Sequence, residues 1–285
     1  MSEFLFRFSR DKGAVFGFAV IALFALLAPI GPYFVSQNPY DLGSLDLANA
    51  YKPPAWLADG DAAFPLGTDE QGRDMLSGIV YGTRISLFIG LCVTLFSCAL
   101  GTIVGLWAGC AGGRVDSVLM RIVDVQLSFP AMLVALFIMS AFGRGLWKLI
   151  AALTLVGWVM YARTVRGAVL AEKGREYVEA ARLIGLPPIL LALRHILPNV
   201  ATPLIVIATV QVGNVILTEA TLSYLGVGVP VTEPSLGLLV KNGYDVLFSG
   251  IWWVSVLPGS FIMLLVFGIN LLGDFLRDEL NPRLK

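Results

Sequence analysis

Few residues of this chain could carry out catalysis or bind a metal ion. His195 is the only histidine, and no carboxylate or cysteine stands beside it, which favours packing or a loop hydrogen bond over a catalytic or metal-binding role. The three cysteines fall in or at the end of one apolar stretch without C-x-x-C or other metal-ligand spacing, which indicates packing; they are Cys92, Cys98 and Cys110. The sequence has no G-x-x-x-x-G-K-[ST] phosphate loop, so the chain cannot hydrolyse ATP by that route. We therefore expect no enzyme activity, metal or cofactor in this chain.

The most informative polar residues form one short segment between two apolar stretches. They are Glu179, Ala180, Ala181, Gly185, Leu197 and Pro198. Ala180 and Ala181 are small enough for close approach by another protein. Gly185 supplies a bend, and Glu179 can make charge-assisted hydrogen bonds. The segment therefore favours a docking role over a catalytic one.

The elements that must position this segment are membrane-spanning helices. Of the 285 residues, 57% are hydrophobic and 14% are charged, and the mean hydropathy is +0.80, which exceeds what a soluble core needs. A bilayer core about 30 Å thick requires roughly 20 apolar residues per helix. The stretches that qualify are 14–35, 85–109, 119–142, 147–165, 200–222 and 251–273. The sequence thus predicts an all-α membrane protein with six transmembrane helices.

The second apolar stretch carries a stripe of small residues at four-residue spacing. They are Ser97, Gly101, Gly105 and Gly109. Small side chains let two helices approach closely, so the stripe predicts helix packing rather than a pore lining.

The distribution of basic residues predicts the orientation. With the N-terminus inside, 14 of the 20 Lys and Arg residues lie on the cytoplasmic side and six lie outside. The basic N-terminal segment, 1–13, precedes an apolar run that is longer than a signal-peptide core, so we expect a retained anchor. The excess of basic residues inside places both termini in the cytoplasm.

This orientation assigns a side to each long loop. The loop 36–84 lies outside and is rich in acidic residues; it is too short for a core of its own but long enough for a docking flap. The loop 166–199 lies inside, and its pattern is helical. One apolar face is predicted from the spacing of Tyr177, Val178, Ala181 and Ile184.

The inner loop also contains signals for a bend between two helices. Gly185 fits the left-handed position that ends a helix. Pro187 and Pro188 suit the first turn of a second short helix that runs to about 195, and Pro198 suits the start of the fifth span.

The gapped pattern Glu179-Ala180-Ala181, Gly185, Leu197-Pro198 resembles the EAA signature of the membrane subunits of bacterial ABC importers. Other patterns narrow the resemblance to the dipeptide, oligopeptide and nickel importer permeases, specifically the second of their two permease subunits. These patterns include Gly67-Thr68-Asp69, Gly72-Arg73-Asp74, Tyr81-Gly82-Thr83-Arg84-Ile85-Ser86-Leu87, Arg194-His195-Ile196-Leu197-Pro198-Asn199 and Leu225-Gly226-Val227-Gly228. The resemblance covers nearly the whole chain. The departures are Leu186-Pro187-Pro188 after the glycine and Leu236 in place of a tryptophan.

The resemblance implies a type I importer transmembrane domain over 85–285 in the bacterial inner membrane. A homologous second permease would complete a heterodimer, two ATPase subunits would bind ATP and Mg, and an extracytoplasmic binding protein would deliver the solute. In the family, the EAA helix sits in a cleft of the ATPase, so the six residues of the docking segment would couple the chain to that subunit. Contact with the binding protein is expected at Asp69, Arg73 and Asp74.

The expected solute is a di- or oligopeptide, because most members of the subfamily import peptides. Nickel complexes, glutathione or another small solute remain alternatives. Beyond these partners the chain would contact membrane lipid, and its zero formal net charge gives no argument for nucleic acid.

The translocation path is expected along the fifth apolar stretch. Gln211, Asn214 and Thr218 share one helical face and should meet a neighbouring helix or a water-filled lumen, because polar groups are costly in lipid. Glu219 lies about 19 residues into the stretch, or roughly 28 Å along a helix, near the outer mouth. Either it attracts the cationic end of a peptide or stabilises an outer gate, or it makes an interfacial hydrogen bond to a neighbouring loop.

Other classes of membrane protein fit the sequence less well. A proton-driven secondary transporter would need carboxylates near the middle of the bilayer and often has inverted repeats, and the sequence shows neither. A membrane enzyme would need clustered histidine, aspartate or cysteine at the membrane face. A passive channel is harder to exclude from composition alone.

Overall fold

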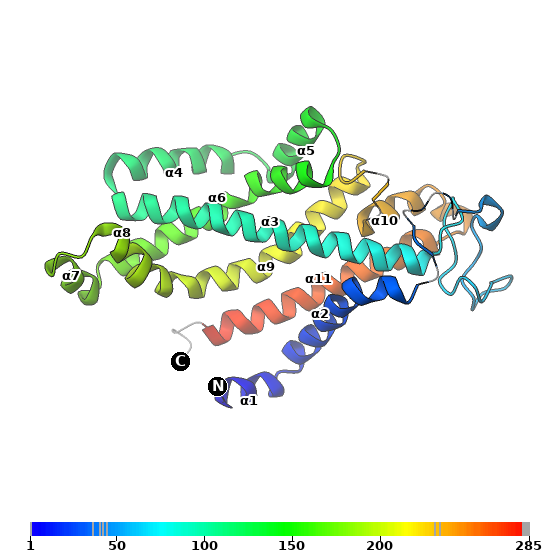
Figure 1. The fold of residues 1–285 in the computed structure, drawn as a ribbon, viewed down its shortest axis with the longest axis horizontal. Helices are drawn as coiled ribbons and strands as arrows, with labels where there is room; N and C mark the ends of the chain where they lie inside the picture. The colour runs from blue at the N-terminus through cyan, green and yellow to red at the C-terminus, as the bar shows by residue number, and fades with distance from the viewer. Residues whose placement is uncertain are drawn as a thin grey trace.

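The computed structural model describes residues 2–35, 37–39, 41, 43, 45–230, 232–233 and 235–280, and the long elements among them are all helices. The last five residues of the predicted importer domain, 281–285, lie outside this part of the chain. The longer helices are α2 (Lys12–Ile30), α3 (Met75–Ala111), α4 (Gly113–Leu127), α5 (Ala131–Phe142), α6 (Leu146–Lys173), α9 (Leu197–Tyr224) and α11 (Trp253–Leu280) (Figure 1). The shorter ones are α1 (Ser2–Arg10), α7 (Glu176–Leu183), α8 (Pro188–Leu191) and α10 (Leu236–Tyr244).

Among the described residues, five helical segments are long and apolar enough to cross a membrane, and α4 and α5 count as a sixth if the bent pair is one span. The bent pair differs from the straight helix expected over 119–142. Its two helices meet at 86°, with the break at residues 128–130. Pro130 explains the break, because the residue before a proline avoids the α-helical conformation and the proline has no N–H to continue the helix.

Helix α3 begins ten residues before the predicted span 85–109. Asp74 caps its first turn, since its carboxylate accepts hydrogen bonds from the backbone N–H groups of Leu76 and Ser77. The helix ends at Gly112, whose φ of +66° favours glycine. At 37 residues, α3 extends well beyond the hydrocarbon of a bilayer.

The predicted small-residue stripe packs α3 closely against α6. A Cβ atom at Gly101 would lie 2.4 Å from the Cβ of Tyr161 and 2.5 Å from the carbonyl oxygen of Trp158. A Cβ atom at Gly105 would likewise lie too close to the backbone of Ala162. The two helix backbones can approach this closely only because these positions lack side chains.

A larger apolar core joins α2, α3, α9, α10 and α11. Phe24, Ile79, Ile216, Leu236 and Leu265 are among its buried side chains. A second core, around Leu149 and Leu222, joins α5 and α6 to α3 and α9.

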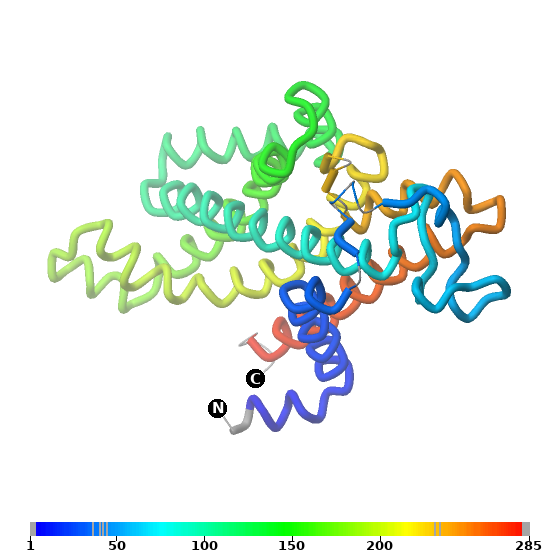
Figure 2. The backbone as a smooth tube through the Cα atoms, turned by 45° about the vertical axis from the view of Figure 1, so that its right-hand side comes forward, coloured from blue at the N-terminus to red at the C-terminus, as the bar shows by residue number. Residues whose placement is uncertain are grey.

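The helices lie lengthwise in an elongated molecule with two distinct ends (Figure 1). The first end, called here the α7 end, carries α7 and α8; α11 runs toward it and α2 runs away from it (Figure 1). The opposite end, called the α10 end, carries α10 and the long loop before α3. Helix α1 turns sharply away from α2 (Figure 2), at Asp11, whose carboxylate caps α2.

The close contact between α3 and α6 predicts how two Gly→Ala substitutions will differ. Gly101→Ala should lower the unfolding temperature, because the added methyl group has no room and overpacking costs about 1–3 kcal/mol. Gly167→Ala in α6 is the matched control. It has no atom within 4 Å of the new Cβ, and Ala favours a helix over Gly by about 1 kcal/mol, so stability should hold or rise. Thermal unfolding of the two purified variants in detergent tests this, and equal unfolding temperatures would contradict the packing.

Candidate functional site

The predicted docking segment folds as a helix, a tight turn and a second helix at the α7 end. Helix α7 ends in a Schellman motif, in which the N–H of Leu186 donates to the carbonyl oxygen of Ala181 and the N–H of Gly185 donates to that of Arg182. Gly185 has a φ of +80°, as its predicted left-handed position requires. Pro187 then caps α8, and Pro188 occupies its first turn.

The second helix of the segment continues into the fifth span. A π-helical turn, Ala192–Ile196, joins α8 to α9, so that Pro188–Tyr224 forms one candidate span. Pro198 has no N–H to donate to the preceding turn, and wide π turns are one way in which a helix accommodates such a gap. The side chain of Leu197 is half-buried, and that of Pro198 is exposed.

Hydrogen bonds join the end of α6 to the end of α3, and join α7 to α6 and α9. Lys173 donates hydrogen bonds from Nζ to the carbonyl oxygens of Gly109 and Cys110, at 2.9 and 2.7 Å. Tyr177 donates to the carboxylate of Glu172 and accepts from the amide of Asn199. Burial, and secondly the hydrogen bond to Glu172, raise the pKa of Tyr177. These bonds fix the segment to the helices that cross the molecule.

The other face of the segment is exposed. Glu179 and Ala180 are exposed, whereas Ala181 is buried beside Val178. The carboxylate of Glu179 makes no hydrogen bond or ion pair with any residue that the structure describes, which differs from the expectation that it holds the loop. Ile184, predicted on the apolar inner face, is instead 79% exposed. The segment thus presents its acidic residue and several apolar side chains outward.

The apolar side chains exposed on this segment form a surface around the turn. They are Leu183, Ile184, Ile189 and Leu193, of which Leu183 is 88% exposed. Together with Glu179 and Ala180 they are called here the turn surface. A contiguous exposed apolar patch of this kind is typical of a protein interaction site.

The predicted polar face of α9 lines a cavity. Gln211, Asn214 and Thr218 contribute to a volume of about 420 Å³ that α6 and the break between α4 and α5 also border. Asn214 donates to the side chain of Gln211 at 2.8 Å, and Thr218 donates to the carbonyl oxygen of Asn214. These side chains therefore already satisfy each other in part.

Glu219 does not line that cavity. Its side chain is fully buried, and its carboxylate accepts hydrogen bonds from Ser86 of α3 at 3.0 Å and from Ser223 at 2.7 Å. Buried charges are held by such bonds. The hydrogen-bond partners of Glu219 thus come from α3 and from α9 itself, whereas the expected hydrogen bond was to a neighbouring loop.

The loop residues expected to contact another protein are buried instead of exposed. Asp69, Arg73 and Asp74 are 1%, 5% and 1% exposed. Asp69 accepts from the N–H groups of Gln71 and Arg73, while Asp74 caps α3. Burial raises the pKa of Asp69, although the two backbone hydrogen bonds oppose that rise. These residues hold the loop together and cannot themselves form a docking surface, which corrects the expectation from sequence.

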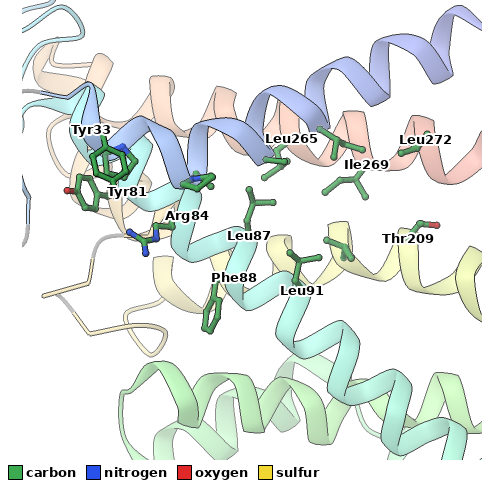
Figure 3. A pocket seen from close by; sticks show the side chains of 16 residues that line it. Tyr33, Tyr81, Arg84, Leu87, Phe88, Leu91, Thr209, Leu265, Ile269 and Leu272 are labelled. Atoms are coloured by element: carbon green, nitrogen blue, oxygen red, sulfur yellow. The ribbon is translucent and has the colours of Figure 1, made fainter.

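A larger cavity lies between α2, α3, α9 and α11, and sequence reasoning missed it, apart from singling out the motif that contains Arg84. Its volume is about 950 Å³. Tyr33, Tyr81 and Arg84 lie at one end, and Leu272 and Thr209 lie at the other, with apolar side chains between (Figure 3). Its lining is mostly apolar.

Within the described part of the chain, no three His, Cys, Asp or Glu side chains are grouped so as to hold a metal ion.

Comparison with known proteins gives matches along most of the chain. Residues 101–285 match the family described as binding-protein-dependent transport system inner membrane component, and residues 1–54 match the N-terminal TM domain of oligopeptide transport permease C. The dipeptide transport system permease protein DppC of Haemophilus influenzae is 38% identical over 285 residues, covering all of this chain and 95% of the relative. The oligopeptide transport system permease protein OppC of Bacillus subtilis is 38% identical over 284 residues, covering 99% and 89%.

The fold has a counterpart among solved structures. An inward-facing structure of the MetNI methionine ABC transporter aligns with a TM-score of 0.60 and 22% identity, over 73% of this chain and 98% of that one. The aligned region shares the fold of the type I importer transmembrane domain that the sequence predicted.

The burial of Glu219 leads to a prediction about stability. Glu219→Ala should lower the unfolding temperature of the purified protein, because it leaves the buried Ser86 and Ser223 hydroxyls without their acceptor, at a cost of about 1–3 kcal/mol. Thr218→Ala, one residue earlier, removes only a hydrogen bond within α9 and should have little effect. If the two variants unfold at the same temperature, the carboxylate does not hold α3 to α9.

Proposed function

The chain belongs to the inner-membrane components of binding-protein-dependent ABC transport systems, and from this premise we propose that it lines the translocation path of an importer of di- and oligopeptides. As a permease subunit it is a multi-pass protein of the inner membrane. Such subunits are not enzymes and bind no cofactor; ATP is hydrolysed by a partner ATPase, and a binding protein delivers the solute.

The peptide assignment is supported by the relatives. Those from Haemophilus influenzae and Bacillus subtilis are named as dipeptide and oligopeptide permeases, and each aligns with nearly the whole chain. The match of residues 1–54 to the N-terminal domain of an oligopeptide permease supports the same class. A second permease would complete the path as a heterodimer, and each permease would engage one ATPase.

The turn surface is the proposed contact with the ATPase. It lies at the α7 end, which the positive-inside rule assigns to the cytoplasm together with both termini. Glu179 has no partner among the described residues, and Leu183 and Ile184 expose apolar area that a protein partner would cover. The exposure of these side chains is the observation that carries the proposal.

Movement of the ATPases would reach the path through rigid connections. Tyr177 attaches α7 to the end of α6 and to Asn199 of α9, Lys173 attaches the end of α6 to that of α3, and α8 is continuous with α9. When ATP binding brings the two ATPases together, the two permeases would follow as rigid bodies and open the path outward. Gln211, Asn214 and Thr218 are the proposed lining, because they border the α9 cavity.

The proposed function is tested by uptake into proteoliposomes. The complex of this chain, its partner permease and both ATPases should accumulate a labelled dipeptide or tripeptide only when ATP and the cognate binding protein are both present. A complex with an inactive ATPase is the control. Saturable uptake of a nickel complex or of glutathione, with no uptake of any peptide in a varied panel, would contradict the peptide assignment. The assignment of the chain to an importer would still hold.

Gly185 provides a prediction about coupling. Gly185→Val should abolish ATP-driven uptake while the chain still inserts, because a β-branched residue is strained at a φ of +80°. No atom lies within 4 Å of a Cβ at this position, so the effect comes from the backbone and not from a clash. Gly185→Asn should retain much of the uptake, since Asn tolerates the left-handed conformation.

The control for this experiment is a second glycine of the same loop. Gly174→Val should be nearly neutral, because Gly174 has a φ of −89° and equally open surroundings. Full ATP-driven uptake by the Gly185→Val complex would show that coupling does not need the bend at Gly185.

A further inference from the structure

Two positive charges from different parts of the chain converge at the α10 end. Lys241 lies in the last turn of α10, and Arg144 lies in the turn between α5 and α6. A Cβ atom at Gly226 would lie 2.7 Å from the Nζ of Lys241 and 3.6 Å from an Nη of Arg144. The loop that follows α9, which contains Gly226, meets both segments in this region (Figures 1 and 2).

Neither cation has a counter-ion among the described residues. Arg144 and Lys241 make no ion pair or hydrogen bond there, and Asp245, close to Lys241 in sequence, pairs with neither. Lys148 adds a third positive charge in the same turn, where its Nζ donates to the carbonyl oxygen of Phe142. Like charges held close together repel each other, so the arrangement favours an anionic group that comes from outside the chain.

Three aromatic side chains, two of them exposed, lie close in sequence to Lys241 and Gly226. Tyr224 and Tyr244 pack edge to face with ring centroids 5.7 Å apart, and Tyr244 packs in the same way on Phe248 at 6.4 Å. Tyr244 is 48% exposed and Phe248 is 88% exposed. Aromatic residues and arginine are enriched at the centres of protein interfaces, where lysine usually lies toward the rim.

We propose that Arg144, Lys241, Tyr244 and Phe248 form the surface on which this chain receives the solute-binding protein, through an acidic patch of that protein. The inference rests on the proposed function and its orientation, which place the α10 end outside. Charge complementarity identifies the partner, since the surface offers unpaired cations beside exposed aromatic rings. This surface replaces Asp69, Arg73 and Asp74, which are buried.

The surface also fits what a transient interaction requires. The binding protein must arrive, release its solute and leave in each cycle, and electrostatic attraction speeds arrival without requiring a large buried interface. Salt screens such attraction over about 8 to 10 Å. Binding should therefore weaken as the salt concentration rises.

The experiment measures the ATPase rate of the whole complex, in nanodiscs of phosphatidylcholine, against the concentration of solute-loaded binding protein. For Arg144→Glu combined with Lys241→Glu, the half-saturating concentration should rise by about tenfold or more, because attraction becomes repulsion. The wild-type value should rise between about 50 and 300 mM NaCl, whereas that of the double variant should change little or fall. The basal ATPase rate and the subunit composition should stay as in the wild type.

Lys52→Glu is the matched control, because Lys52 is a cation at the same end whose charge is already paired with Asp61 at 2.9 Å. Its half-saturating concentration should stay within about twofold of the wild type, since exposed ion pairs contribute little. Tyr244→Ala tests the aromatic part and should raise the half-saturating concentration with the salt dependence preserved.

Three results would overturn the proposal. The first is an unchanged half-saturating concentration in the double variant. The second is loss of the other permease from the purified double variant, which would make this surface the contact between permeases. The third is a defect that appears only in nanodiscs with phosphatidylglycerol, which would make it a lipid site. If the wild-type complex itself shows no stimulation by any binding protein, the proposed importer function fails instead.

Discussion

The close contact between α3 and α6 is the interaction on which the rest of the structure depends. Gly101 and Gly105 let the two backbones touch, and a single methyl group at either position would meet atoms of the facing helix. Helix α3 starts at the loop that holds the α10 end together, and α6 ends beside the turn surface. Because the pair packs over much of its length, the two ends of the molecule are held in a fixed relation.

Polar and charged side chains are arranged differently inside the spans and at the two ends of the molecule. Inside the spans, Glu219 accepts hydrogen bonds from Ser86 and Ser223, and Asn214 borders a cavity. The α7 end exposes apolar side chains and the Glu179 carboxylate, which has no partner among the described residues. The α10 end carries exposed aromatic rings and two cations, Arg144 and Lys241, that have no counter-ion in the described part of the chain. Two different proposed docking surfaces, one at each end, suit a subunit that transmits motion between partners.

The sequence predicted features that depend on local chemistry and missed those that depend on tertiary burial. The left-handed turn at Gly185 and the packing stripe at Gly101 follow from glycine alone. The burial of Asp69 and Asp74 could not be predicted from the local sequence, because acidic residues in a loop usually face water. In the folded chain the surrounding loop covers them. The surface of Arg144 and Lys241 was missed for the same reason: 97 positions separate them in sequence, and only the fold brings them to Gly226.

The central claim is that the turn surface is where the ATPase acts on this chain, and crosslinking tests it most directly. In a variant with Cys92, Cys98 and Cys110 replaced by alanine, a cysteine at Leu183 would carry a maleimide photocrosslinker, with a cysteine at Tyr33 of the opposite end as control. We expect crosslinks from Leu183 to the ATPase whose yield or position changes when ATP binds, and none from Tyr33. No ATPase crosslink from Leu183 in an assembled, ATP-hydrolysing complex would contradict it.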